Sequence, residues 1–169
     1  MQSTNFFWGG VFMKQGRKNN KEVKTKIHAM PLKPKASFDN FRNIDQKLAV
    51  AVGNLWGMVW GKSDPAIDQK TKLLLSLANA VGAGRIRQAA RELIKAYSLG
   101  VTVDELDELF MLFIWNQGIG NFASEIGTSV LFKAYQMIKE ADTQGVQREQ
   151  ILKKLIEIFG EENPDVSIR

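Results

Sequence analysis

Residues 79–102, NAVGAGRIRQAARELIKAYSLGVT, decide the fold class of this chain. Gly100 stands where a left-handed residue commonly ends a helix. Before it, apolar residues recur every three or four positions, as one face of an α-helix requires; they are Ile86, Ala90, Leu93 and Tyr97. We therefore expect a helix over residues 85–99, preceded by a tight helix–helix turn at residues 82–84.

A nucleotide-binding loop is the functional alternative for residues 82–84. A G-x-G-x-x-G loop needs a third glycine where Arg87 stands, and a strand before it, where the sequence predicts a helix. The pattern therefore favours a turn that lets two helices pack.

Helical patterns continue on the C-terminal side. Thr102 and Glu105 form a capping-box pair before a fourth helix. The glycine-containing stretch NQGIGN, residues 116–121, then interrupts the chain. Two further helices are expected over residues 122–138 and 146–159.

On the N-terminal side we expect two helices. One runs over residues 65–81, with Asp64 as its N-cap and Pro65 in its first position. The other is a single helix with one apolar stripe, made of Phe38, Phe41, Ile44, Leu48, Val52, Leu55 and Val59. Since no stretch alternates convincingly with period two, the chain is expected to be an all-α bundle of about six helices, in one domain over residues 36–169.

The charge is concentrated at one end. The 169-residue chain has a net charge of +5, yet residues 1–35 hold eight Lys/Arg and one Glu, so the remainder is slightly acidic. We expect a basic, flexible tail there, either solvated or serving as a polyanion-binding arm. Met30 opens a stretch typical of a protein start, so residues 1–29 could be an upstream extension. For the folded part, nucleic-acid binding is not expected.

Composition excludes several chemistries. The chain has no cysteine, which removes thiolate nucleophiles, disulfides, Fe–S clusters and Cys-based zinc sites. The only histidine, His28, lies in the basic tail without a second ligand type nearby, so we expect neither a metal site nor a Ser-His-Asp triad. No cofactor is predicted. No apolar run reaches the roughly 18 residues of a membrane span, and Phe6–Met13 fits a secretory signal badly, so we expect a cytoplasmic protein.

The third expected helix carries the candidate site. Arg85, Gln88 and Glu92 fall on one stripe of it, at i, i+3 and i+7. These side chains could form a polar cluster in a pocket, or a surface stripe held by weak hydrogen bonds. Spacing alone leaves both open.

Residues 68–120 resemble the carboxymuconolactone decarboxylase family, which includes the alkyl hydroperoxidase D-like proteins. The resemblance rests on a helix start at Asp68 with Lys70-Thr71-Lys72, on Gly84 and on Gly118, and on two motifs, Gly100-Val101-Thr102 and Asp104-Glu105-Leu106. It covers roughly residues 38–140. It implies an all-α fold of that type and a homo-oligomer, a trimer or hexamer, with the pocket near subunit contacts. The apolar LFMLFIW segment, residues 109–115, agrees with an oligomer.

The catalytic positions implied by the resemblance are replaced. The peroxidase branch uses a Glu, a Cys-x-x-Cys pair and a His, and those positions fall on Leu73, Arg85 with Gln88, and Glu92. The decarboxylase branch has histidines at Glu92 and near Leu112. A cysteine peroxidase is therefore not expected.

Two functional hypotheses remain. The first is an oligomeric small-molecule-binding or catalytically degenerate family member, with a pocket lined by Trp60, Arg85, Gln88, Glu92, Trp115 and Asn116. The second is a decarboxylase-like lyase that handles lactones, in which Glu92 acts as acid and base and Arg85 holds a substrate carboxylate. Polyanion binding by the tail is a weaker third hypothesis.

Overall fold

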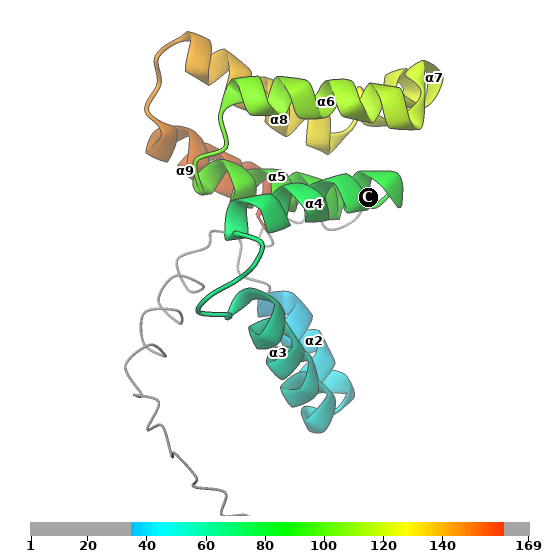
Figure 1. Cartoon of the computed structure of the whole chain (residues 1–169), viewed down its shortest axis with the longest axis vertical. Helices are drawn as coiled ribbons and strands as arrows, with labels where there is room; N and C mark the ends of the chain where they lie inside the picture. The colour runs from blue at the N-terminus through cyan, green and yellow to red at the C-terminus, as the bar shows by residue number, and fades with distance from the viewer. Residues whose placement is uncertain (1–34, 161–169) are drawn as a thin grey trace, which may run out of the picture.

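The computed structural model describes residues 35–160, and all regular secondary structure in that range is helical (Figure 1). This confirms the all-α class. The predicted tail, with His28 and Met30, and residues 161–169 lie outside the described residues. The elements are α2 Lys35–Ile44, α3 Gln46–Trp60, α4 Gln69–Gly82, α5 Ile86–Ser98, α6 Val103–Gln117, α7 Ile119–Asn121, the π-helix η1 Phe122–Ile126, α8 Val130–Thr143 and α9 Arg148–Phe159.

The helices are arranged in three tiers. Figure 1 shows α6 and α8 at the top, α4, α5 and α9 in the middle, and α2 and α3 as a hairpin at the bottom. Helix α5 is the centre of the core, because it packs against α4, α8 and α9. Seven of its thirteen residues are buried. A candidate site on α5 is therefore held by three neighbouring helices.

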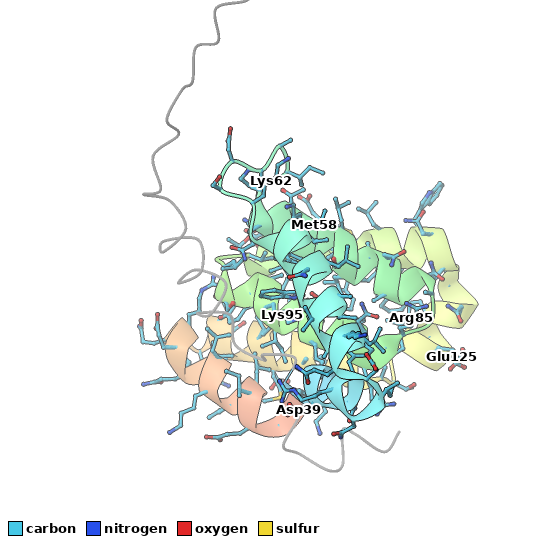
Figure 2. All side chains as sticks on the ribbon, turned by 90° about the horizontal axis from the view of Figure 1, so that it is seen from below. Asp39, Met58, Lys62, Arg85, Lys95 and Glu125 are labelled. Atoms are coloured by element: carbon cyan, nitrogen blue, oxygen red, sulfur yellow. The ribbon has the colours of Figure 1, made fainter. Side chains whose placement is uncertain are left out.

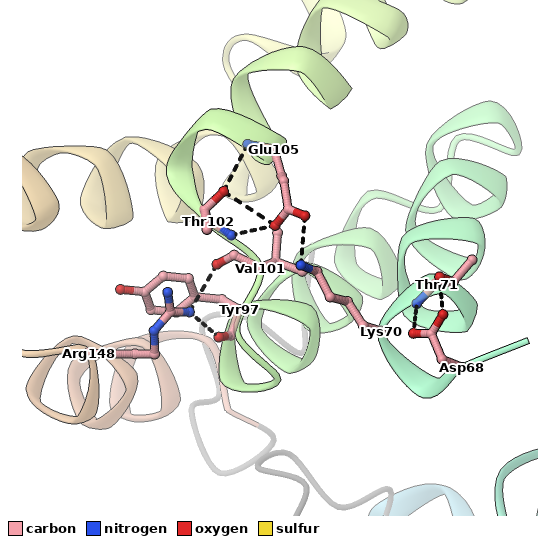
Figure 3. A network of polar contacts seen from close by, with 8 residues as sticks. All are labelled: Asp68, Lys70, Thr71, Tyr97, Val101, Thr102, Glu105 and Arg148. Atoms are coloured by element: carbon pink, nitrogen blue, oxygen red, sulfur yellow. Dashed lines mark hydrogen bonds and ion pairs between the residues drawn. The ribbon is translucent and has the colours of Figure 1, made fainter.

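The C-terminus of α5 is fixed by two features. Gly100 has φ 92°, so the predicted left-handed residue is confirmed, and the chain turns back so that the Val101 N–H donates to the Ala96 carbonyl. Arg148 of α9 donates to the Tyr97 and Val101 carbonyls and stacks on the Tyr97 ring, 4.1 Å from its centroid (Figure 3). A cation at this position also complements the negative end of the helix dipole.

The start of α6 is fixed in a similar way. The predicted capping box is confirmed: Thr102 Oγ1 accepts from Glu105 N, and Glu105 Oε2 accepts from Thr102 N. Lys70 of α4 donates to Glu105 Oε1 at 2.7 Å and thereby ties the two helices together (Figure 3). The predicted interruption after α6 is confirmed at Gly118, which has φ 81°.

Three predicted helix boundaries are wrong. The single helix expected over residues 38–59 is broken at Asp45, whose extended backbone lets its side chain cap Lys47 N and Leu48 N. Helix α4 begins at Gln69 and not at Pro65, because Asp68, not Asp64, accepts from the Thr71 N–H and hydroxyl. The helix expected over residues 122–138 is divided, because Ser129 caps a new helix at Phe132 N.

Five rings hold α6, η1 and α8 together. Phe110 stacks on Tyr135 at 4.2 Å between centroids, and the other rings meet edge to face or tilted around this pair. The Tyr135 hydroxyl donates to Asp107 Oδ1, and Lys139 donates to Asp107 Oδ2. The upper tier is thus joined both by ring packing and by a charged pair.

Candidate functional site

The candidate stripe lies along α5 and is longer than predicted. Arg85 occupies the N-cap position, and Gln88, Glu92 and Lys95 follow at successive turns. In the view from the hairpin side, Arg85 and Lys95 are drawn on either side of α3 (Figure 2). Arg85 and Gln88 are exposed, whereas Glu92 is buried. The three predicted residues therefore share a stripe but differ in their access to solvent.

Glu92 is the one buried charged residue in the described part of the chain. Its side chain is 10% exposed, and Lys95 Nζ lies 3.3 Å from Oε1. The other oxygen, Oε2, is buried without a hydrogen-bond partner among residues 35–160. Because a buried carboxylate oxygen without a donor is costly, this atom calls for an explanation.

The surroundings of Glu92 combine apolar packing with positive charge. Ala89 and Leu93, beside it on α5, belong to the buried core. Arg91 is half-buried; burial lowers the pKa of its guanidinium, and the negative charge of Glu92 opposes that shift. Including its N-cap, α5 carries four cationic residues, Arg85, Arg87, Arg91 and Lys95, and one carboxylate, Glu92. The helix as a whole therefore carries a positive balance around one buried carboxylate.

The remaining predicted site residues belong to α3 and α6 and lie near opposite ends of α4. Trp60, at the end of α3, packs partly buried against the core, near the Val59 carbonyl that accepts from Lys72 Nζ at 2.8 Å. Asn116 is exposed and Trp115 is 84% exposed. Both residues lie near the C-terminal end of α6. Gln117, the next residue, approaches Gly82 at the end of α4. Trp115 and Asn116 are thus exposed, whereas Glu92 is buried.

Two residues of this region were missed by the sequence reasoning. Lys95 lies one turn after Glu92, and Arg91 immediately precedes Glu92. The i, i+3 spacing of Glu92 and Lys95 was a signal that could have found the first of them. No pattern in the sequence shows that Glu92 Oε2 lacks a donor.

Comparison of the chain with protein-family models, with curated proteins and with solved structures gives no match. Within residues 35–160, no helix has the length and apolar character that crossing a membrane requires. The same residues contain no cluster of three or more His, Cys, Asp or Glu side chains placed to hold a metal ion. The site must therefore be interpreted from its own geometry.

Proposed function

We propose that this chain is an oligomeric small-molecule-binding protein of the carboxymuconolactone decarboxylase-like type, without a thiol relay. The observation that carries the proposal is the buried, unpartnered Oε2 of Glu92, on a helix that is otherwise cationic. A ligand that donates a hydrogen bond to Oε2 would satisfy this atom. The half-satisfied carboxylate is then explained as part of a binding site.

The charges indicate the ligand class. Arg85 lies seven residues before Glu92, which is about 10 Å along a helix axis. Long side chains at these two positions can contact opposite ends of one small molecule. Because the Arg fork binds carboxylates bidentately, a small hydroxycarboxylate fits best, with its carboxylate on Arg85 and its hydroxyl donating to Glu92.

Thermal shift measurements test this binding. We expect 4-hydroxybenzoate, whose carboxylate and hydroxyl lie at opposite ends, to raise the melting temperature of the full chain, and lactate and inorganic phosphate to do so less. The variants Glu92→Gln and Arg85→Ala should lose the shift, whereas Glu157→Gln, on an exposed position of α9, should keep it. Equal shifts in all three variants, or no shift with 4-hydroxybenzoate, would refute the proposal.

The second candidate function is a decarboxylase-like lyase acting on lactones. The same unpartnered Oε2 favours it, since a buried carboxylate can accept and return a proton, with Arg85 holding the substrate carboxylate. With carboxymuconolactone as the probe, Glu92→Gln should abolish CO₂ release and leave the mass of the assembly unchanged. Undiminished CO₂ release in that variant would remove Glu92 from the mechanism.

Three further predictions concern the assembly, the location and the N-terminal tail. The resemblance predicts a homo-oligomer, a trimer or hexamer, and the sequence predicts a cytoplasmic location. Polyanion binding by residues 1–35 remains the weaker alternative. It predicts salt-sensitive binding to a nucleic acid or an anionic vesicle that is lost when residues 1–29 are deleted.

A further inference from the structure

The α2–α3 hairpin is apolar without being buried. Ten of the fifteen residues of α3 are apolar, yet none of residues 46–60 is buried in the structure of residues 35–160. Five large side chains of the hairpin are 44–75% exposed, namely Ile44, Val50, Leu55, Met58 and Val59. We call these five residues the hairpin face. This number of exposed apolar side chains on one short hairpin is typical of an interaction site.

A second apolar surface lies on the other side of the molecule. Met111, Leu112, Trp115 and Ile119 are 54–84% exposed. The first three follow one another at helical spacing along α6, and Ile119 begins α7 directly after the break at Gly118. We call these four residues the α6 face. In Figure 1 the middle tier of α4, α5 and α9 separates α6 from the hairpin. The two faces of one copy therefore do not meet each other.

The charges around the two faces are complementary. Residues 35–62 hold four Lys/Arg and two Asp, a balance of +2. Residues 103–126 hold five Asp/Glu and no Lys or Arg; Lys70 and Lys139 of other helices pair with Glu105 and Asp107, and Asp104, Glu108 and Glu125 keep this region negative. Lys62 follows α3 at its end, and Glu125 lies at the edge of the molecule in the same view (Figure 2). Pairing two hairpin faces, or two α6 faces, would bring like charges together. Pairing unlike faces brings opposite charges together.

We propose that the hairpin face of one copy docks on the α6 face of a second copy, in a head-to-tail contact. Helix α3 is about 22 Å long, and with α2 beside it the hairpin is about 20 Å wide. These dimensions give a flat footprint of about 440 Å² on each copy, which corresponds to the small end of specific interfaces. A head-to-tail contact closes into a ring when its rotation allows, and otherwise propagates. In either assembly Trp115 becomes an interface residue.

Complementation between two variants tests this contact. Light scattering should give the full chain a mass that is a multiple of 19.0 kDa. Met58→Glu blocks the hairpin face and Leu112→Glu blocks the α6 face, so each variant alone should be monomeric. Mixed together, they should form a 1:1 dimer and nothing larger, because each retains one intact face. Leu75→Glu, at a 55% exposed position of α4 outside both faces, should assemble as the wild type does.

Several outcomes would overturn the proposal. These are a monomeric wild type, a Leu112→Glu variant that assembles normally, and a mixture of folded variants that gives no dimer. Circular dichroism of each variant establishes that it is folded, and Met58→Gln with Leu112→Gln provide a milder pair if the charged variants unfold. Since Arg85 and Glu92 lie outside both faces, the ligand test can fail while this contact holds, and the reverse is equally possible.

Discussion

Helices α5 and α3 show how similar apolar content can give opposite packing. Seven of the thirteen residues of α5 are apolar and most of them are buried, whereas ten of the fifteen residues of α3 are apolar and none is buried. Helix α5 is surrounded by α4, α8 and α9, while the main helix contact of α3 is with α2. Apolar content alone therefore does not decide whether a helix is buried; the helices that pack around it do.

The largest expected difference between the two regions is in the cost of removing a leucine. Leu93→Ala opens a cavity at a fully buried position of α5 and should lower the free energy of unfolding by about 3 kcal/mol. Leu55→Ala, at a 60% exposed position of α3, should cost less than about 0.5 kcal/mol in a dilute monomer. Urea denaturation measures both. Equal costs would mean that the hairpin is packed as firmly as the core.

The contact of Arg148 with the end of α5 should be the next most costly to lose. Arg148→Ala removes two charge-assisted hydrogen bonds and the stack on Tyr97, for an expected loss of about 2 kcal/mol. Lys154→Ala, at an exposed position of the same helix, is the matched control and should change stability by less than about 0.5 kcal/mol. If the two variants have the same melting temperature, Arg148 does not stabilise the C-terminus of α5.

Replacing a glycine by alanine should lower stability at the end of α5 and raise it within α3. Gly100→Ala forces a side chain into a φ of 92° and should cost about 1 kcal/mol. Gly57→Ala lies inside α3 with no atom within 4 Å of the added Cβ, and should stabilise the hairpin by up to about 1 kcal/mol. Helix content and melting temperature measure both effects. A destabilising Gly57→Ala would show that another chain segment approaches α3 closely at this point.

The smallest expected effect concerns pH. The hydrogen bond from Lys139, and then the one from the Tyr135 hydroxyl, hold the pKa of Asp107 below its ordinary value. Because the folded pKa is the lower one, the stabilisation is present above about pH 4 and is lost as the pH falls through the folded value.

Asp107→Asn should therefore flatten the loss of stability below about pH 4. Asp104→Asn removes a carboxylate from the same helix while leaving the Lys139 pair intact, and it should keep the wild-type profile. Identical acid unfolding curves for the two variants would show that the Asp107 pair is not linked to folding.

The sequence predicted local features better than tertiary ones. Thr102 with Glu105 and the left-handed Gly100 could be predicted because each depends on a few neighbouring residues. The helix break at Asp45 could not, since an acidic residue inside an apolar stripe fits a solvent-facing position as well as a cap.

The candidate site was predictable only as a stripe. The spacing of Arg85, Gln88 and Glu92 placed them on one side of a helix, and the structure shows them there. Periodicity could not show that Glu92 is buried while Arg85 is exposed, because burial depends on the helices that pack around α5. The exposure of Trp115 could not be predicted from the sequence for the same reason.

Hydrogen exchange measured at two protein concentrations tests most directly whether the hairpin depends on a second copy. We expect the amides of residues 86–98 to be protected in both samples, because they belong to the core of one copy. Residues 46–60 should be protected only in the concentrated sample, where the hairpin face is covered. Protection of residues 46–60 equal to that of residues 86–98 in a dilute, monomeric sample would contradict this account.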